Sequence, residues 1–265
     1  MGVKTVISIE ELNEIFPQYN FIKIVPTESG IIDTTYIVST KTESYILKKY
    51  EREIPNKIAL DIQLLGELKT AGLNVPVCLE QNSGWYLYTK LEGSQPKTIK
   101  SYHIQAIARF LAKLHKTTSK NICDCNIMIE TEVTDALKYT KAHYFSYYKK
   151  FEFLKHFTHE NNMLIHGDIF KDNTIFNANK VGVIDFIDSS CGTLSFDVAV
   201  TLIGFDAKSH NDYFINIFLS AYNQHAPKKL TKKLVKEKMK IASHYYALKR
   251  VYKYKNTFRA KELLT

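Results

Sequence analysis

The chain has 265 residues, of which 45% are hydrophobic and 24% are charged, and its formal net charge at pH 7 is +9. This size and composition are typical of a soluble globular protein, and they exclude both a disordered chain and a small domain that needs disulfide or metal staples. No stretch reaches the ~18 apolar residues of a membrane helix and no secretory or lipidation signal opens the sequence, so we expect a cytoplasmic protein without membrane attachment.

The first 90 residues carry the patterns of a small antiparallel sheet with two helices. Ser8 and Glu11 form a capping box, which predicts a short helix that ends near Pro17. Segments rich in β-branched and aromatic residues predict strands at residues 21–25, 34–40, 44–50, 76–81 and 85–91, the first three as an antiparallel meander. Between the third and fourth strands, Pro55 and Gly72 bound a long helical pattern.

The rest of the chain carries mainly helical patterns. Long helices are expected at residues 99–117, 131–159 and 228–261, the last of them amphipathic and basic. The change of pattern predicts a boundary within residues 91–96. It divides the chain into an N-terminal nucleotide-binding lobe, residues 1–90, and a C-terminal catalytic and substrate-binding lobe, residues 91–265. The expected fold class is α+β, with a larger, mainly helical second lobe.

The four cysteines do not form a recognisable metal or disulfide pattern. They include one C-x-C pair but no second pair and no histidine at metal-ligand spacing. We therefore expect free thiols at Cys78, Cys123, Cys125 and Cys191.

The stretch LIHGDIFKDNTIF, residues 164–176, places polar residues on a turn between two predicted strands. His166, Asp168 and Asn173 have the spacing of the catalytic loop of phosphoryl-transfer enzymes, and Asp185 follows at the end of the apolar segment VGVI. Taken singly, Asp and Asn are common turn formers, and His166 is expected to hold the turn through backbone hydrogen bonds. The four residues together, at this spacing, predict phosphoryl transfer.

Phosphoryl transfer gives each of these residues a role. Mg²⁺ prefers hard oxygen ligands and keeps several positions for water and phosphate, so one carboxylate and one carboxamide suffice. We therefore expect Asn173 and Asp185 to bind Mg²⁺, with ATP as the phosphoryl donor. Asp168 is expected to hold the acceptor hydroxyl and to take its proton.

The third strand should supply a lysine for the nucleotide phosphates. Strand alternation places Lys48 and Lys49 on opposite faces, and comparison with the V-A-I-K pattern favours Lys48. We expect Asp61, which lies on the apolar stripe of the following helix, to pair with Lys48. Gly30 would let a loop backbone approach the phosphates, although the sequence has neither a P-loop nor a G-x-G-x-x-G motif.

The segments HGDIFKDN, GVIDF and SFDVAV resemble the aminoglycoside phosphotransferase and choline kinase superfamily, and GIIDTTYIV together with HGDIFKDNTIF resembles the homoserine kinases within it. The resemblance covers nearly the whole chain and implies a protein-kinase-like bilobal fold. It also implies that Asp197 braces the catalytic loop. Adenine would stack in the interlobe cleft on residues 88–93, with backbone contacts near Thr89 and Leu91.

The acceptor is less closely defined than the reaction. The resemblance implies L-homoserine, a small-molecule substrate with a carboxylate and an ammonium, for which Asp33, Asp188 and Arg109 are imaginable partners. Alternatives are a kinase of the same fold that acts on choline, an aminoglycoside or another amino alcohol, and a non-catalytic scaffold that binds nucleic acid through the basic C-terminal segment. Intact Asp168, Asn173 and Asp185 argue against the scaffold. A monomer or a homodimer is expected.

Overall fold

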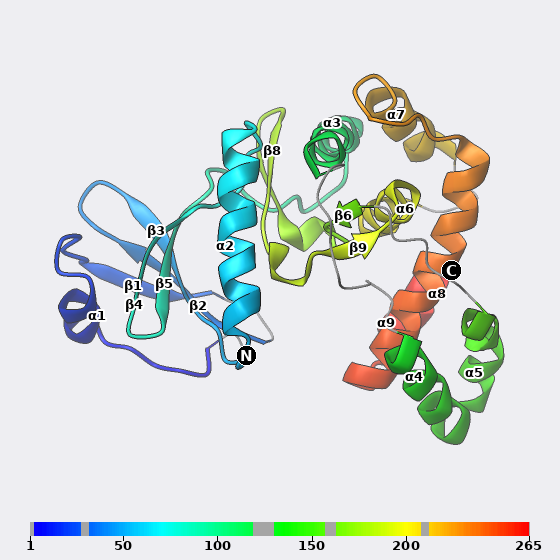
Figure 1. Ribbon diagram of the computed structural model, residues 1–265, viewed down its shortest axis with the longest axis horizontal. Helices are drawn as coiled ribbons and strands as arrows, with labels where there is room; N and C mark the ends of the chain where they lie inside the picture. The colour runs from blue at the N-terminus through cyan, green and yellow to red at the C-terminus, as the bar shows by residue number, and fades with distance from the viewer. Residues whose placement is uncertain (1–2, 28–31, 119–129, 157–162, 208–211, 265) are drawn as a thin grey trace. The chain divides into compact units, whose positions relative to one another are not determined.

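The computed structural model of the chain describes residues 3–27, 32–118, 130–156, 163–207 and 212–264 (Figure 1). The chain forms two compact units, and the division falls at Glu92, inside the stretch where the sequence pattern changes. The first unit contains the chain up to Glu92, and Gly182–Ile187 is grouped with it. The sequence boundary had placed this short segment in the second lobe. The second unit contains the remaining residues.

The first unit is built on one antiparallel sheet of five strands in the order β1-β2-β3-β5-β4. The strands are β1 (Lys23–Pro26), β2 (Thr34–Ser39), β3 (Ser44–Lys49), β4 (Cys78–Asn82) and β5 (Trp85–Thr89). The predicted meander of the first three strands is confirmed, since β1 pairs with β2 and β2 with β3. Alternation along β2 buries every second residue, beginning with Thr34, so one face of the sheet is in the core.

Two helices accompany this sheet. The predicted capping box of α1 (Ile9–Ile15) is present, because Ser8 accepts from the Glu11 N–H while the Glu11 carboxylate accepts from the Ser8 N–H. The α1 side chain Leu12 packs into a core cluster with the sheet residues Val38 and Leu47. Helix α2 (Pro55–Thr70) has Pro at its first turn, as the sequence predicts, and it buries Ile58, Asp61, Leu65 and Leu68.

The second unit is mainly helical. Its helices are α3 (Ser101–Thr118), α4 (Glu130–His143), α5 (Phe145–Phe151), α6 (Leu194–Gly204), α7 (Asp212–Tyr222), α8 (Lys232–Tyr254) and α9 (Thr257–Leu264), with a 3₁₀ turn at Glu152–His156. Helix α6 is buried along almost all its length, and α8 packs against it. A sheet-based first unit and a mainly helical second unit form the α+β fold class that the sequence predicts.

Short strands surround the segment that the sequence analysis singled out. Strand β6 (Met163–Ile165) pairs antiparallel with β9 (Ser190–Gly192). Strand β7 (Thr174–Asn177) forms a second two-stranded sheet with β8 (Lys180–Val183). The polar turn between the two predicted strands thus runs from the end of β6 to the start of β7, with a 3₁₀ turn at Lys171–Asn173.

Two of the predicted long helices are broken. The described part of the segment 131–159, which ends at His156, forms α4, α5 and a 3₁₀ turn because the backbone leaves the helical conformation at Tyr144, with φ −142° and ψ 58°. The basic C-terminal segment forms α8 and α9, since Lys255 adopts a left-handed φ of 52°. Asn256 then caps α9, where its Oδ1 accepts from the Arg259 N–H at 3.0 Å. This capping residue was not predicted from the sequence.

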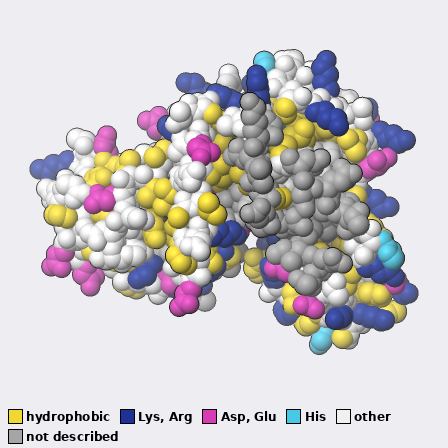
Figure 2. Space-filling view, in the orientation of Figure 1, with side chains coloured by type: hydrophobic (Ala, Val, Ile, Leu, Met, Phe, Trp, Pro, Cys, Tyr) yellow, Lys and Arg dark blue, Asp and Glu magenta, His cyan; other side chains and the backbone are white. Residues whose placement is uncertain are grey.

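The basic C-terminal segment uses its tyrosines in the core. Tyr245 and Tyr246 of α8 are only 3% and 4% exposed, so their rings are not available for stacking on nucleic-acid bases. On the face that Figure 2 shows, Lys and Arg side chains are dispersed among other types rather than gathered into one basic patch. Neither observation favours a nucleic-acid-binding scaffold.

The cysteine expectation is partly wrong. Cys78 is a free thiol as expected, and burial raises its pKa to about 11. Cys191, buried in β9, is disulfide-bonded instead, while Cys123 and Cys125 lie outside the described residues. None of the described helices is both long enough and apolar enough to span a membrane.

Candidate active site

Asp168 and Asn173 lie side by side on the loop that joins β6 to β7. The Asn173 Nδ2 donates to the Asp168 backbone carbonyl at 2.8 Å and to the Asp168 Oδ2 at 3.3 Å. The loop backbone closes on itself, because the Phe170 N–H donates to the Asp168 carbonyl and the Asn173 N–H donates to the Phe170 carbonyl. A carboxylate and a carboxamide are thus held together in one rigid turn.

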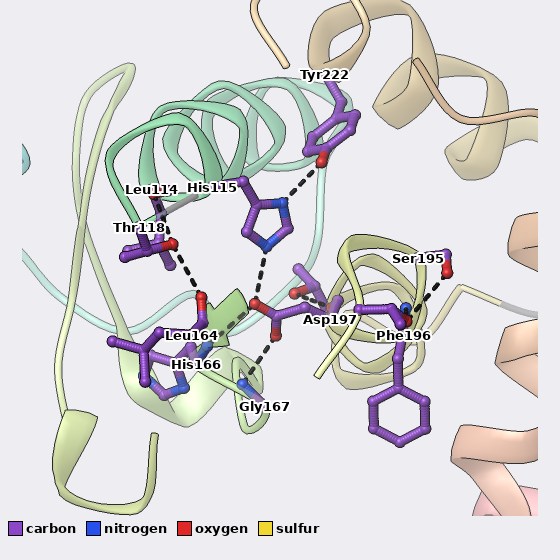
Figure 3. A network of polar contacts seen from close by, with 12 residues as sticks. Leu114, His115, Thr118, Leu164, His166, Gly167, Ser195, Phe196, Asp197 and Tyr222 are labelled. Atoms are coloured by element: carbon purple, nitrogen blue, oxygen red, sulfur yellow. Dashed lines mark hydrogen bonds and ion pairs between the residues drawn. The ribbon is translucent and has the colours of Figure 1, made fainter. Parts of the chain in front are cut away.

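Asp197, in the first turn of α6, holds the start of this loop. Its Oδ2 accepts from the His166 N–H at 3.1 Å, and its Oδ1 accepts from the Gly167 N–H at 2.8 Å (Figure 3). Gly167 has a φ of 73°, a left-handed conformation that glycine adopts without steric cost. These contacts are those that the predicted bracing role of Asp197 requires.

Asp197 is fully buried, and its partners stabilise the charged form of its carboxylate. His115 of α3 places Nε2 at 3.0 Å from the Asp197 Oδ2, and its Nδ1 lies 2.7 Å from the Tyr222 hydroxyl of α7 (Figure 3). Burial alone would raise the pKa of Asp197, but the hydrogen bond and electrostatic effect of His115, the electrostatic effect of His166 and the hydrogen bond from the Gly167 N–H lower it below its usual value. The carboxylate therefore remains an acceptor for the loop backbone.

His115 and Tyr222 were not found from the sequence. His115 continues the buried face of α3, and Tyr222 ends an apolar helix, so neither stands out from ordinary core residues. Thr118 adds a third link from α3, since its hydroxyl donates to the Leu164 carbonyl of β6 at 2.9 Å. Only the folded chain brings these residues to the base of the loop.

The side chain of His166 also supports the turn. It is 1% exposed, and its Nδ1 accepts from the Asp168 N–H at 3.2 Å. An accepting Nδ1 requires that any ring proton lies on Nε2. This position fits the structural role that the sequence analysis gave to His166.

Two helices of the second unit touch the loop closely. The Tyr246 hydroxyl of α8 donates to the Gly167 carbonyl, one residue before Asp168. On α6, a Cβ added to Gly204 would lie 2.7 Å from the Ile169 carbonyl oxygen and 2.8 Å from the Phe170 Cα. The glycine therefore allows the end of α6 to approach the loop backbone.

Lys48 lies between two carboxylates of the first unit. Its Nζ is 3.4 Å from the Asp185 Oδ1 and 4.0 Å from the Asp33 Oδ2, and it stands 4.7 Å from the centre of the Tyr50 ring. Lys49, on the opposite face of β3, stands over Trp85 instead. Strand alternation thus separated the two lysines correctly, although Asp33 was not expected beside Lys48.

Asp185 has an unusual backbone and an accessible carboxylate. It follows β8 in a left-handed conformation, with φ 67°, and its side chain is 46% exposed. The Val183 N–H donates to the Asn74 carbonyl at 3.1 Å, which joins this segment to the first unit. Non-glycine residues in this conformation are uncommon and occur often at functional sites.

The other predicted site residues have various environments. Asp61 is buried in α2 and acts electrostatically on Tyr50, so its pairing with Lys48 stays a prediction. Thr89 is tied to Val77 by its N–H and its hydroxyl, and Leu91 packs over Gly182. Gly30 lies outside the described residues. Asp33 accepts a hydrogen bond from Arg52. Arg109, on α3, and Asp188, which follows Ile187, are both exposed.

Asn173 in the second unit and Asp185 in the first unit each present a hard oxygen that could bind a metal ion. No group of three or more His, Cys, Asp or Glu side chains in the described ranges could hold a metal. Because the Asn173 nitrogen is committed to a carbonyl and a carboxylate, the amide oxygen is left as a hard ligand. Asp185 offers a second hard oxygen. Mg²⁺ typically uses one or two such protein ligands together with phosphate oxygens.

The fold and the loop together define a protein-kinase-like phosphotransferase. The family model described as "Phosphotransferase enzyme family" matches residues 23–226, which is more than half of the chain. The chain belongs to this family and is a phosphotransferase enzyme.

Curated relatives and solved structures agree with this assignment. The homoserine kinase of Zymomonas mobilis is 26% identical to this chain over 240 residues, which cover 79% of this chain and 75% of the relative. The homoserine kinase of a Janthinobacterium species is 24% identical, and the match covers 84% of this chain and 75% of the relative. The macrolide 2′-phosphotransferase of Brachybacterium faecium has a TM-score of 0.71 at 12% identity, covering 97% of this chain and 96% of the other. Choline kinase of Streptococcus pneumoniae has a TM-score of 0.68 at 17% identity, covering 96% and 95%.

Proposed function

We propose that this enzyme transfers the γ-phosphoryl group of ATP to the side-chain hydroxyl of L-homoserine. The observation that carries the proposal is the loop in which Asn173 and Asp197 fix Asp168 at a turn between β6 and β7. The choice of acceptor is supported by the curated relatives, which are named homoserine kinases. ATP as donor is supported by the phosphotransferase family and by a related amicoumacin kinase whose structure holds AMP-PNP and Ca²⁺.

Asp168 would act on the acceptor hydroxyl. Its Oδ2 accepts from the Asn173 Nδ2 at 3.3 Å, and an ionised carboxylate has two acceptor oxygens, so it can also accept from a substrate hydroxyl. The hydroxyl would donate to Asp168, which orients the oxygen in line with the phosphoryl group and takes its proton as the new P–O bond forms. No covalent intermediate on the protein is needed, because positioning and charge neutralisation carry the reaction.

Asn173 and Asp185 would hold Mg²⁺. A bound Mg²⁺ would neutralise charge on the phosphate oxygens during transfer. The Asn173 amide is oriented for this by its two bonds to Asp168, and Asp185 is presented by its left-handed backbone. Lys48, beside Asp185, would supply a cation for the α and β phosphates.

The test is an acceptor panel. Purified protein with Mg·ATP is incubated with L-homoserine, choline, hydroxylysine or kanamycin, and ADP is measured. We expect ADP formation with L-homoserine above the rate without acceptor, loss of activity with EDTA, and recovery with Mg²⁺. A higher kcat/KM for choline or kanamycin would contradict the proposed acceptor, and stimulation by none of the four together with salt-sensitive RNA binding would favour the scaffold.

A further inference from the structure

Lys249 lies one helical turn from the contact between α8 and the catalytic loop. Its Nζ stands 5.4 Å from the centre of the Tyr245 ring and 5.2 Å from that of the Tyr246 ring. Tyr246 is the residue whose hydroxyl donates to the Gly167 carbonyl. Residues three and four apart share one face of a helix, so Lys249 is on the face of α8 that meets the loop.

The ammonium of Lys249 is half-buried, and none of the described residues places a counter-ion at contact distance from it. Among the residues that the structure describes, no hydrogen bond or ion pair reaches its Nζ. Its neighbour Lys253 pairs with Glu132 at 3.4 Å. Lys249 instead lines a small hollow between α4 and α8, with Val133 and Leu248 among the lining residues. A cation withdrawn from water without a partner is costly, unless a ligand supplies the missing anion.

Several charges act on Lys249 from the elements around it. Burial is the main effect and lowers its pKa, and Lys253 acts in the same direction. The carboxylates of Asp168, Glu132 and Asp188 oppose this shift without neutralising it. Lys249 is thus a cation set among carboxylates, an arrangement that matches a ligand carrying both an anionic and a cationic group.

We infer that Lys249 binds the carboxylate of the acceptor and thereby selects a hydroxyl-bearing amino acid over amino alcohols that lack a carboxylate. This inference rests on the proposed function. An acceptor whose hydroxyl meets Asp168 must direct its own carboxylate away from that residue, because the two anions repel. Lys249 provides a place for it, because its Nζ stands 5.2 Å from the centre of the Tyr246 ring, and the Tyr246 hydroxyl contacts the residue before Asp168. The ammonium of the acceptor then lies among carboxylates. A hydroxy acid without an ammonium cannot make this interaction.

The experiment compares Lys249→Met with the matched control Lys240→Met. Lys240 is an exposed lysine of the same helix that stands 5.9 Å from the Phe153 ring, so its variant tests the loss of a lysine in a similar helical setting. Steady-state constants are measured for L-homoserine, for 3-aminopropan-1-ol, which lacks only the carboxylate, and for 4-hydroxybutyrate, which lacks only the ammonium. Calorimetric binding of L-homoserine with Mg²⁺ and a non-hydrolysable ATP analogue gives a readout independent of turnover.

We expect Lys249→Met to lower kcat/KM for L-homoserine roughly 100-fold, mainly through KM, and to weaken its binding by a similar factor. The constants for 3-aminopropan-1-ol should not change, so the preference of the enzyme for L-homoserine should fall by the same factor. Lys249→Arg should recover part of the loss, and Lys240→Met should behave as wild type. Thermal melting shows whether each variant folds, and Lys249→Met should melt no lower than wild type because it removes a poorly compensated charge.

Two failures are distinguishable. If wild type forms no ADP with L-homoserine, the proposed function is wrong and the inference falls with it. If wild type uses L-homoserine while folded Lys249→Met keeps the wild-type KM and binding constant, the inference alone is overturned. An equal loss toward L-homoserine and 3-aminopropan-1-ol would also overturn it, since the lysine would then act on the loop rather than on the carboxylate.

Discussion

Asp168 offers the most direct test at the residue scale. Asp168→Asn keeps the size of the side chain but removes the group that accepts the hydroxyl proton. We expect kcat to fall by roughly 10²- to 10⁴-fold. Nucleotide binding should survive, because Asn173 keeps its bond to the Asp168 backbone carbonyl. Turnover and ADP binding are measured on the same preparation, and a near-normal kcat in this variant would remove Asp168 from its assigned role.

Lys48 and Lys49 form a natural pair of variants. Lys48 lies 3.4 Å from Asp185, whereas Lys49 lies on the other face of β3, over Trp85. We expect Lys48→Met to raise the KM for ATP by roughly 10- to 100-fold, because a cation near the phosphates is lost. Lys49→Met should leave the KM for ATP within about twofold of wild type. Equal effects of the two substitutions on ATP would contradict the assignment.

Which residues could be found from the sequence depended on how local their signal is. Asp168 and Asn173 are five positions apart on one turn, so their spacing alone indicated a shared role. Alternation along a single strand was likewise enough to separate Lys48 from Lys49. His115 and Tyr222 join Asp197 from distant helices, and nothing near them in the chain marks a polar network. Their roles depend on tertiary packing that a sequence pattern does not show.

At the scale of elements, Gly204 tests how tightly α6 positions the catalytic loop. A Cβ at this position would lie 2.7 Å from the Ile169 carbonyl oxygen, so backbone must move to accept it. We expect Gly204→Ala to lower the free energy of unfolding by about 1–3 kcal/mol and to lower kcat more than the KM for ATP. Urea denaturation and steady-state kinetics provide the two measurements.

Gly66 in α2 is the matched control for this substitution. A Cβ there would meet nothing within 4 Å, so alanine adds helix propensity without a clash. Gly66→Ala should therefore raise the free energy of unfolding by about 0.5–1 kcal/mol and leave kcat unchanged. If both variants lost stability to the same extent, close packing between α6 and the loop would not explain the effect at Gly204.

Elements whose limits are set locally were predicted well, and those set by tertiary contacts were not. The capping box of α1 and the alternation in β2 and β3 lie within a few residues, and the structure has them as expected. The break at Tyr144 and the assignment of Gly182–Ile187 to the first unit have no comparable signal. The segment Gly182–Ile187 is joined to the first unit by a backbone hydrogen bond from Val183 to Asn74, two residues more than one hundred positions apart in the sequence.

At the scale of the whole molecule, Asp197 links the stability of the second unit to pH. Its carboxylate joins α6 to the catalytic loop and, through His115, to α3 and α7. Although burial opposes its charged form, its partners hold its folded-state pKa below the usual 3.8. Below about pH 4 the unfolded chain therefore binds a proton at this site more readily than the folded chain does, and stability rises with pH through that range.

The stabilisation by Asp197 should be fully present above about pH 4 and lost as pH falls through the folded-state pKa. We expect Asp197→Asn to be less stable than wild type at pH 7, because it loses the carboxylate that contacts His115 and accepts from the loop backbone. The difference between the two proteins should shrink as pH falls from 5 to 3. Urea denaturation at half-unit pH steps measures it, with Asp135→Asn as a control at an exposed carboxylate of α4 outside the network. A difference that stayed constant across this range would show that the charge of Asp197 does not hold the loop to its helices.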